Sequence, residues 1–307
     1  MASLPIVDVD VPVSSAGART ARPAWLRVQA PGSGKTSELR QLLAERRLHT
    51  VCSSAACPNM GDCWSAGTAT FMILGNECTR ACRFCDVKTA ASPSSVDLDE
   101  PERLAEAAVL MGLKHVVITS VARDDLDDGG ARHFARCLRA VRARLPSATL
   151  EVLVPDFLGS EESIETVLTA LLESGRPAVF NHNVETCERL TPKIRSGAVY
   201  RRSLTLLQTA KRQRPEIRTK TGMMLGLGET DDEIIATIKD ARAHDVDILT
   251  LGQYLRPSSW NHEVVRYVTP EQFNELGAFA RTLGFAHVES GPLVRSSYHA
   301  ERGVSPT

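Results

Sequence analysis

The sequence predicts an α/β protein, a partial (β/α)6 TIM-like barrel with an N-terminal and a C-terminal extension. Apolar runs of strand length alternate six times with amphipathic stretches of helix length, as in βαβ units of a parallel sheet. Polar residues and glycines follow these runs, where such a barrel places its functional residues. A length of 307 residues suits one domain of this size.

The composition is that of an ordinary globular protein. Hydrophobic residues make up 43% and charged residues 24% of the chain, and the net charge is −1. This balance gives no general attraction to nucleic acid or to a membrane surface. No apolar run is long enough to span a bilayer, and the N-terminus lacks a secretory pattern. We therefore expect a cytoplasmic protein without nucleic-acid or membrane partners.

The N-terminal part precedes the alternating pattern. Residues 1–20 are rich in Ser, Pro, Ala and Val without a period, and we expect a flexible tail. Residues 21–66 form an extension in which leucine spacing predicts a helix over 36–50. The segment 52–66 combines three Cys with Pro, Asn and Gly, which predicts an irregular loop.

The central part, residues 67–285, carries the alternation, and residues 286–307 form a C-terminal segment. One helix begins with Thr230 and Glu233 at the spacing of a capping box. We expect strands at 69–75, 114–121, 149–157, 177–184, 218–226 and 247–254, and helices near 99–111, 130–144, 160–174, 199–213, 230–244 and 270–283.

Cysteine usage indicates metal ligands. The chain has eight Cys, and six of them lie between Cys52 and Cys85. Such clustering in a chain without secretory features favours metal binding over disulfides. Cys137 and Cys187 have no partner motif, and we expect them to be plain buried thiols.

The strongest motif is C-x3-C-x2-C, formed by Cys78, Cys82 and Cys85 directly after the first strand. Three thiolates are too few to close a structural zinc site. A four-iron cluster normally takes four Cys, so three leave one iron open to another ligand. A zinc loop with a distant fourth ligand is the alternative, but zinc sites prefer C-x2-C pairs. The spacing favours an iron–sulfur cluster.

A second trio lies just upstream. Cys52, Cys57 and Cys63 have the spacing C-x4-C-x5-C, which is wide for zinc. A second iron–sulfur cluster fits better, and its fourth ligand has to come from elsewhere in the chain.

The two trios together resemble the lipoyl synthase family of radical S-adenosylmethionine (SAM) enzymes. Biotin synthase is similar in the first trio but lacks the second trio and the terminal RSSY. Small departures from the family pattern occur at 191–196 and 260–263. The likeness covers most of the chain, through blocks such as GTATFMILGNECTRACRFCDV (67–87), VVITSVARDDLDDGGARHF (116–134), TKTGMMLGLGETDDEI (219–234) and VESGPLVRSSYHA (288–300).

The resemblance implies two [4Fe-4S] clusters and SAM as cofactors. The trio from Cys78 to Cys85 would hold the cluster whose open iron binds SAM, within a radical SAM partial barrel. One electron from that cluster cleaves SAM to a radical that removes hydrogen from an unactivated C–H bond. The upstream trio would hold an auxiliary cluster. Its fourth ligand would be a serine oxygen of the terminal segment, and we expect Ser297, with Ser296 as the alternative.

The resemblance also implies the reaction. Family members insert two sulfur atoms, at C6 and C8, into a protein-bound octanoyl-lysine to give lipoyl-lysine, and the auxiliary cluster donates the sulfur. This is the work of a sulfurtransferase. The implied partners are octanoylated lipoyl carrier domains (the E2 subunits of 2-oxoacid dehydrogenases and the glycine-cleavage H protein), a ferredoxin- or flavodoxin-type electron donor and an iron–sulfur carrier for cluster repair.

Polar residues at the strand ends are candidates for SAM or octanoyl-lysine contacts, although each could equally make a structural hydrogen bond. His182 among them is expected to be a network residue without a catalytic role. Phe84 is expected against the cluster, SAM or the core, and Gly226 and Gly228 predict a tight turn. The candidates are Thr119, Ser120, Arg123, Asp124, Asn181, His182, Asn183 and Glu185.

Other interpretations are a different two-cluster radical SAM enzyme that inserts sulfur, and a non-enzymatic electron-transfer protein or zinc scaffold. The segment from Gly32 to Thr36 resembles the end of a P-loop. That motif needs a glycine where this chain has Gln29, and no buried strand precedes it, so we expect no phosphate site there.

Overall fold

The computed structural model describes residues 23–26, 34–54 and 59–303. Three features of the sequence lie outside the described residues: the expected tail at 1–20, Gly32 of the P-loop-like segment, and Cys57 of the upstream trio.

An eight-stranded sheet forms the centre of the molecule, with the order β1-β2-β5-β6-β7-β8-β9-β10. Its first strand, β1 (His49–Thr50), is antiparallel to β2 (Thr68–Ile73). All other neighbours are parallel. Within the described residues the edges at β1 and β10 do not pair, so the sheet is open. The remaining strands are β5 (His115–Ser120), β6 (Thr149–Leu153), β7 (Ala178–Asn181), β8 (Arg218–Leu225), β9 (Ile248–Gln253) and β10 (His287–Ser290).

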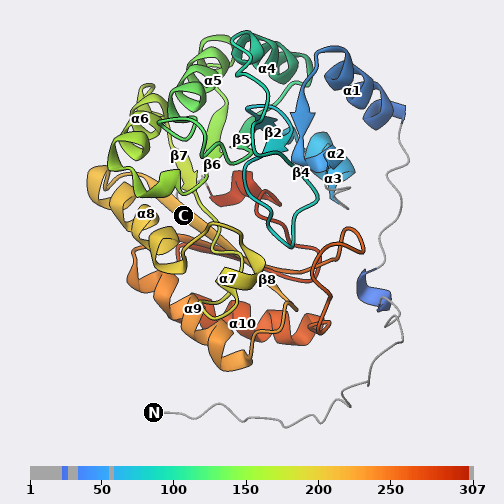
Figure 1. Cartoon of the computed structure of the whole chain (residues 1–307), viewed down its shortest axis with the longest axis vertical. Coiled ribbons are helices and arrows are strands. Elements are labelled where there is room, and N and C mark those ends of the chain that lie inside the picture. Colours follow the sequence, from blue (N-terminus) through green and yellow to red (C-terminus); the bar gives the residue numbers. More distant parts are fainter. Residues whose placement is uncertain (1–22, 27–33, 55–58, 304–307) are drawn as a thin grey trace.

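The parallel strands β2 and β5 to β9 are buried along most of their length, whereas only Val288 of β10 is buried. All six residues of β2 and of β9 are buried, as continuous apolar runs covered on both faces require. A helix follows each strand from β5 to β9, and the helices form an arc around the outside of the sheet (Figure 1). They are α5 (Ala131–Arg144), α6 (Glu161–Leu172), α8 (Tyr200–Gln213), α9 (Asp231–Ala243) and α10 (Pro270–Thr282), joined in the arc by α4 (Glu100–Leu110) before β5.

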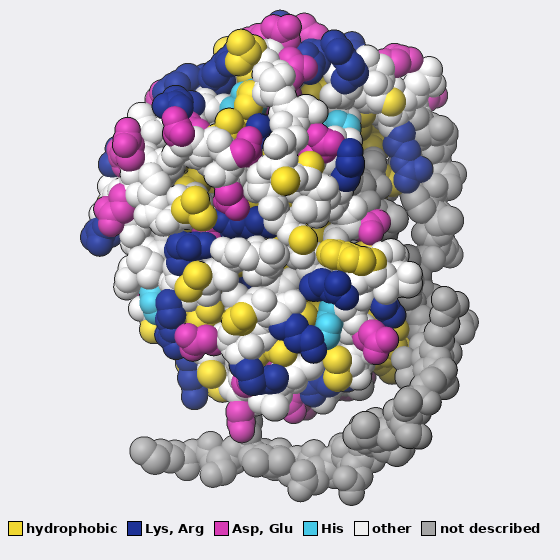
Figure 2. Space-filling view, in the orientation of Figure 1, with side chains coloured by type: hydrophobic (Ala, Val, Ile, Leu, Met, Phe, Trp, Pro, Cys, Tyr) yellow, Lys and Arg dark blue, Asp and Glu magenta, His cyan; other side chains and the backbone are white. Residues whose placement is uncertain are grey.

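The helices begin and end where local chemistry predicts. Thr230 and Glu233 form the expected capping box of α9, and Thr269 and Gln272 form another at α10. None of the described helices has both the length and the apolar content of a membrane span. Basic and acidic side chains are interspersed on the face shown in Figure 2, in keeping with a net charge near zero.

The alternation of strands and helices is confirmed, but the sheet has two strands more than the six expected. β1 has only two residues, and β10 reads His-Val-Glu-Ser, so neither forms an apolar run that a pattern could reveal. β10 pairs with β9 and therefore brings the start of the segment 286–307 into the sheet.

The N-terminal extension is more regular than expected. α1 (Gly34–Glu45) is shorter than the expected helix over 36–50. The segment 52–66, expected as an irregular loop, contains the end of α2 (Val51–Ser54) and all of α3 (Met60–Ser65). Met60 and Trp64 explain α3, because their spacing of four residues buries both side chains on one helix face. The short elements that complete the fold are η1 (Ala24–Leu26), β3 (Glu77–Cys78), β4 (Lys88–Thr89), η2 (Phe157–Gly159), α7 (Thr191–Ile194) and η3 (Ala300–Gly303).

The N-terminal extension and the C-terminal segment lie against each other. The Asn59 side-chain amide donates to the Leu293 carbonyl at 2.7 Å. At the start of β2, the Thr68 hydroxyl also reaches the C-terminal segment and donates to the Glu301 carboxylate at 3.2 Å. These contacts join parts of the chain that are more than 230 residues apart in sequence.

Candidate metal centres

The first cysteine loop begins at a turn that buried groups hold in place. The chain leaves β2 through Leu74, whose φ of +67° lies in the left-handed region. The Leu74 N–H donates to the Glu100 carboxylate at 2.9 Å, and His133 Nε2 lies 2.7 Å from the same oxygen. The parallel pair β3–β4 then closes the loop, with Cys78 opposite Thr89. The path of the chain into the motif is therefore fixed by α4 and α5.

The three cysteines of this loop are free and half-buried. The N–H groups of Arg80 and Ala122 donate to Cys78 Sγ at 3.4 and 3.3 Å. Burial raises the pKa of Cys82 to about 12 and also raises that of Cys85, and neighbouring cysteines of the motif add to both shifts. Thiols this close together would lose their protons to a soft metal, and the N–H donors would stabilise the resulting sulfur charge.

The donor atoms of this loop are all sulfur. Within the described ranges, no three His, Cys, Asp or Glu side chains are arranged to hold a single metal ion. An all-sulfur donor set of three fits a [4Fe-4S] cluster that keeps one iron for another ligand.

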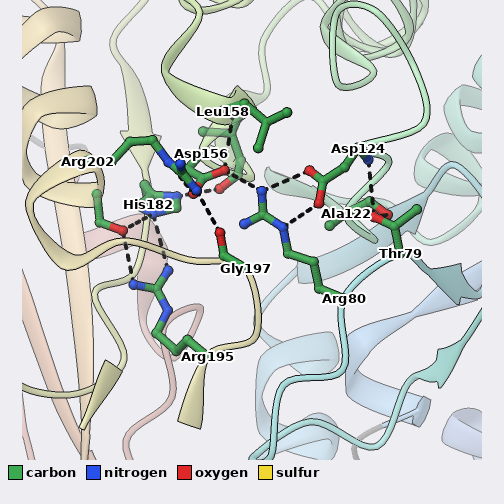
Figure 3. A network of polar contacts seen from close by, with 12 residues as sticks. Thr79, Arg80, Ala122, Asp124, Asp156, Leu158, His182, Arg195, Gly197 and Arg202 are labelled. Carbon is green, nitrogen blue, oxygen red and sulfur yellow. Dashed lines mark hydrogen bonds and ion pairs between the residues drawn. The ribbon is translucent and has the colours of Figure 1, made fainter. Parts of the chain in front are cut away.

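Arg80 fixes the middle of this loop (Figure 3). Its guanidinium donates to Asp124 at 2.7 Å and to the fully buried Asp156 at 2.6 Å. Arg202 on α8 shares Asp156 at 2.9 Å. The loop is thereby tied to the ends of β5 and β6. The motif treats position 80 as a spacer, so sequence reasoning missed this contact.

The second site is a cavity between the N-terminal extension and the C-terminal segment. Cys52, Cys63 and Ser297 all line it, whereas Ser296 does not. Burial raises the pKa of the Cys52 thiol. The other lining residues are Asn59, Met60, Thr68, Ala69, Thr70, Arg295 and Tyr298.

These two sites can be compared with known proteins. The model of the radical SAM superfamily matches residues 72–241. A lipoyl synthase from Halalkalibacterium halodurans is 52% identical over 285 residues, covering 92% of each chain. One from Xanthomonas campestris pv. campestris is 51% identical over 298 residues, covering 97% of this chain and 86% of that protein. The chain belongs to the lipoyl synthase family.

Solved structures agree on the fold. Streptococcus suis SuiB bound to its precursor peptide SuiA has a TM-score of 0.56 at 11% identity, covering 84% of this chain and 53% of that one. HydG, a maturase of the [FeFe]-hydrogenase, has a TM-score of 0.54 at 13% identity, covering 90% and 68%.

Three of the expected contact residues of this lipoyl synthase family member already have protein partners. The Thr119 hydroxyl donates to the Leu153 carbonyl at 2.8 Å. Arg123 pairs with Asp125 at 2.8 Å, and Asp124 pairs with Arg80. These bonds stabilise the loop after β5, so a structural role accounts for all three.

Other expected residues keep unpaired atoms. Ser120 Oγ, Asn181 Oδ1 and Asn183 Oδ1 are buried and have no partner in the structure. The Asn183 amide donates to Glu185 at 3.0 Å, and burial raises the pKa of Glu185. Glu185 also has a φ of +63°, a conformation that costs free energy for this residue type. Buried acceptors and a strained acid at the ends of β5 and β7 are features of a ligand site.

The remaining expectations concern packing. Phe84 is partly buried against the hydrophobic core. Cys137 and Cys187 are buried free thiols whose pKa burial raises, as expected. Gly226 has a φ of +102°, and a Cβ there would lie 2.4 Å from the Arg266 carbonyl. The space that this glycine leaves open is therefore occupied by the protein's own backbone at Arg266.

Proposed function

We propose that this chain inserts two sulfur atoms, at C6 and C8, into the octanoyl chain of a protein-bound octanoyl-lysine, giving lipoyl-lysine. The single observation that carries the proposal is 52% identity over 92% of the chain to a lipoyl synthase. The two separate cysteine sites support it, because a simple radical SAM enzyme needs only the first. The cofactors are SAM and two [4Fe-4S] clusters.

Cys78, Cys82 and Cys85 would hold the cluster that binds SAM. When bound, the cluster and SAM supply the one-electron chemistry that breaks an unactivated C–H bond, which no side chain can do. The chain's own contribution is to place the loop. Arg80 pairs with Asp124 and Asp156, and backbone N–H groups donate to the Cys78 sulfur.

Cys52, Cys57, Cys63 and Ser297 would hold the auxiliary cluster that donates sulfur. The shared cavity supports three of them, and Cys57 is assigned from its spacing alone. The cavity favours Ser297 over Ser296. A hard oxygen ligand is poorly matched to a soft cluster, so it would be displaced more readily than a thiolate. That property suits a cluster that has to give up sulfur.

The sheet and its helices would act as a partial (β/α)6 barrel, with residues 67–285 as its expected extent. Six parallel strands in sequence order, β2 and β5 to β9, support this arrangement. We propose Ser120, Asn181 and Glu185 as SAM contacts, because they keep unpaired or strained groups at the strand ends. Thr119 and Arg123, also expected as SAM contacts, would instead order the loop.

The proposed partners follow from the reaction. An octanoylated carrier domain would present its lysine arm to the space between the two cysteine sites. A ferredoxin- or flavodoxin-type protein would supply electrons, and an iron–sulfur carrier would rebuild the auxiliary cluster. We propose a cytoplasmic location, where such partners are found.

The test is anaerobic reconstitution followed by reaction with SAM, reductant and an octanoyl-lysyl peptide, read by mass. The expected product carries two added sulfur atoms, from protein with about eight irons per chain. Cleavage of SAM without any sulfur insertion would instead indicate another two-cluster radical SAM enzyme. Colourless protein with zinc would indicate a scaffold.

Three variants separate the sites. Cys63→Ala should still cleave SAM but insert no sulfur, and Cys57→Ala should behave in the same way. Cys82→Ala should do neither. Normal lipoyl product from Cys63→Ala would disprove the sulfur-donor role of the cavity.

A further inference from the structure

Arg195 is a buried arginine whose direct contacts are all neutral. It follows α7 and is 6% exposed. Its guanidinium donates to Ser203 Oγ at 3.0 Å and approaches His182 Nε2 at 3.4 Å. Among the described residues, no carboxylate lies at ion-pair distance from it. The other buried lysine and arginine side chains, Arg123 and Lys220, each contact a carboxylate. A buried charge without a counter-charge is costly.

His182 cannot supply the missing charge. Its Nδ1 lies 2.8 Å from the Val154 carbonyl, which can only accept, so Nδ1 carries the proton. Nε2 is then an acceptor for Arg195 and Ser203. Burial lowers the pKa of His182 to about 4, so the ring is neutral at physiological pH. The cation is thus held in place by two neutral acceptors.

The neighbouring acids are occupied or too distant. Asp156 already pairs with Arg80 and Arg202, two cations for one carboxylate. Glu185 attracts Arg195 from beyond ion-pair distance, and its carboxylate accepts from Asn183 instead. Neither acid therefore explains why a guanidinium is buried at this point.

The segment that carries Arg195 packs against the first cysteine loop. The Arg83 N–H donates to the Ile194 carbonyl at 2.8 Å, which joins the residue after Cys82 to the residue before Arg195. On the other side, a Cβ at Gly197 would lie 3.5 Å from the Arg80 side chain. Figure 3 shows Arg195 and Arg80 on either side of the Gly197 segment.

We propose that Arg195 is the internal counter-cation of the cluster held by Cys78, Cys82 and Cys85. Three thiolates give that cluster a net negative charge, and one-electron reduction adds another. A fixed positive charge nearby in a low-dielectric interior favours the reduced state. Arg195 is therefore a positioning residue. Its positive charge acts through the cluster and makes the cluster easier to reduce. The inference rests on the proposed function only in requiring a cluster at these cysteines.

The test measures the reduction potential, not turnover. All variants are made in a Cys63→Ala background, so that the remaining cluster is the only paramagnetic species on reduction. The potential is titrated anaerobically without SAM and followed by EPR. Arg195→Gln should make one-electron reduction about tenfold less favourable, which is a shift of about 59 mV to more negative values for one electron.

Two further variants separate charge from packing. Arg195→Lys keeps the charge but not the planar group, and its potential should stay close to that of the parent. Arg139→Gln removes an exposed arginine paired with Glu173 and should change nothing. If Arg195→Gln does not fold, Arg195→Met replaces it. This variant also removes the charge and keeps an unbranched side chain, so it should give the same shift to more negative values.

Three results would overturn the inference. The first is an unchanged potential in Arg195→Gln or, where that variant does not fold, in Arg195→Met. The second is an equal shift in Arg195→Lys and Arg195→Gln, which would show that packing matters and charge does not. The third is an unchanged SAM-free potential with weakened SAM binding by equilibrium dialysis, which would assign the guanidinium to the SAM carboxylate. Failure of the proposed function would look different: a normal potential series in an enzyme that does not thiolate octanoyl-lysine.

Discussion

The buried ion pair between Lys220 and Glu151 should dominate the stability of the sheet interior. Lys220 Nζ lies 2.9 and 3.1 Å from the two Glu151 oxygens. The side chains are 3% and 0% exposed. Lys220→Met fills a similar volume with an apolar chain but leaves the carboxylate without its cation. Breaking such a pair from one side typically costs about 3–5 kcal/mol.

The remaining neighbours place this variant at the lower end of that range. The Asn181 amide still donates to Glu151 at 3.0 Å, and His115 Nε2 lies 3.7 Å away. We therefore expect a loss of about 3 kcal/mol. Burial raises the pKa of Glu151, but Lys220 and His115 together bring it below its ordinary value. Without Lys220 that pKa rises, so the deficit should shrink as the pH falls and Glu151 takes up a proton.

Urea unfolding followed by circular dichroism, under anaerobic conditions at neutral pH, measures the difference. The double variant Lys220→Met/Glu151→Leu should recover at least half of the loss, because it leaves no unpaired charge. Arg139→Met breaks an exposed pair with Glu173 and should cost less than about 0.5 kcal/mol. A cost below about 1 kcal/mol for Lys220→Met, or no recovery in the double variant, would refute the reasoning.

Three other predictions concern the surroundings of the first site. Burial lowers the pKa of His182 to about 4, so its neutral form contributes stability that is complete above about pH 6.5 and is lost as the pH falls toward 4. His182→Asn should therefore reduce the change of the thermal midpoint with pH across that range. A pH profile equal to that of the parent protein would contradict this. Gly130→Ala should lower the free energy of unfolding in urea by about 1–3 kcal/mol, because φ is +92° and the new Cβ would lie 2.3 Å from Leu74. The control Gly175→Ala, where φ is +64° and the space around the new Cβ is open, should lower it clearly less. Arg80→Lys loses its planar contacts to two acids and should speed iron loss to a chelator roughly tenfold, the equivalent of about 1.4 kcal/mol; an unchanged rate would remove Arg80 from loop placement.

The predictable part of the fold is the part with local periodicity. β9 reads Ile-Leu-Thr-Leu-Gly-Gln and is buried throughout, so its pattern is visible in the sequence. β10 contains one valine among polar residues and becomes a strand only because β9 offers a free edge. Its pairing is a tertiary effect that no short window contains.

The same division applies to the candidate sites. Cysteine spacing indicates both loops, because all ligands of a trio lie within a few residues. Arg80 and its partners Asp124 and Asp156 are 44 and 76 residues apart in sequence, and such pairs leave no local pattern. Ser296 and Ser297 are chemically identical neighbours, so only the shape of the cavity distinguishes them. Arg195 belongs to no sequence motif, and its proposed role follows from its burial without a counter-charge.

The hydrogen bond between Asn59 and Leu293 has a consequence for synthesis in the cell. The strands β2, β5 and β6 beside the first cysteine loop are synthesised early, and the loop contacts that lie furthest along the chain are those of Asn261 and His262. The walls of the second cavity come from residues 52–70 and 295–298, so that cavity has no closed form until translation is nearly finished. The second site can thus bind iron only later than the first. A chain that ended a dozen residues before position 303 would lack the C-terminal wall of the second cavity and would lose that site, while the first site would remain.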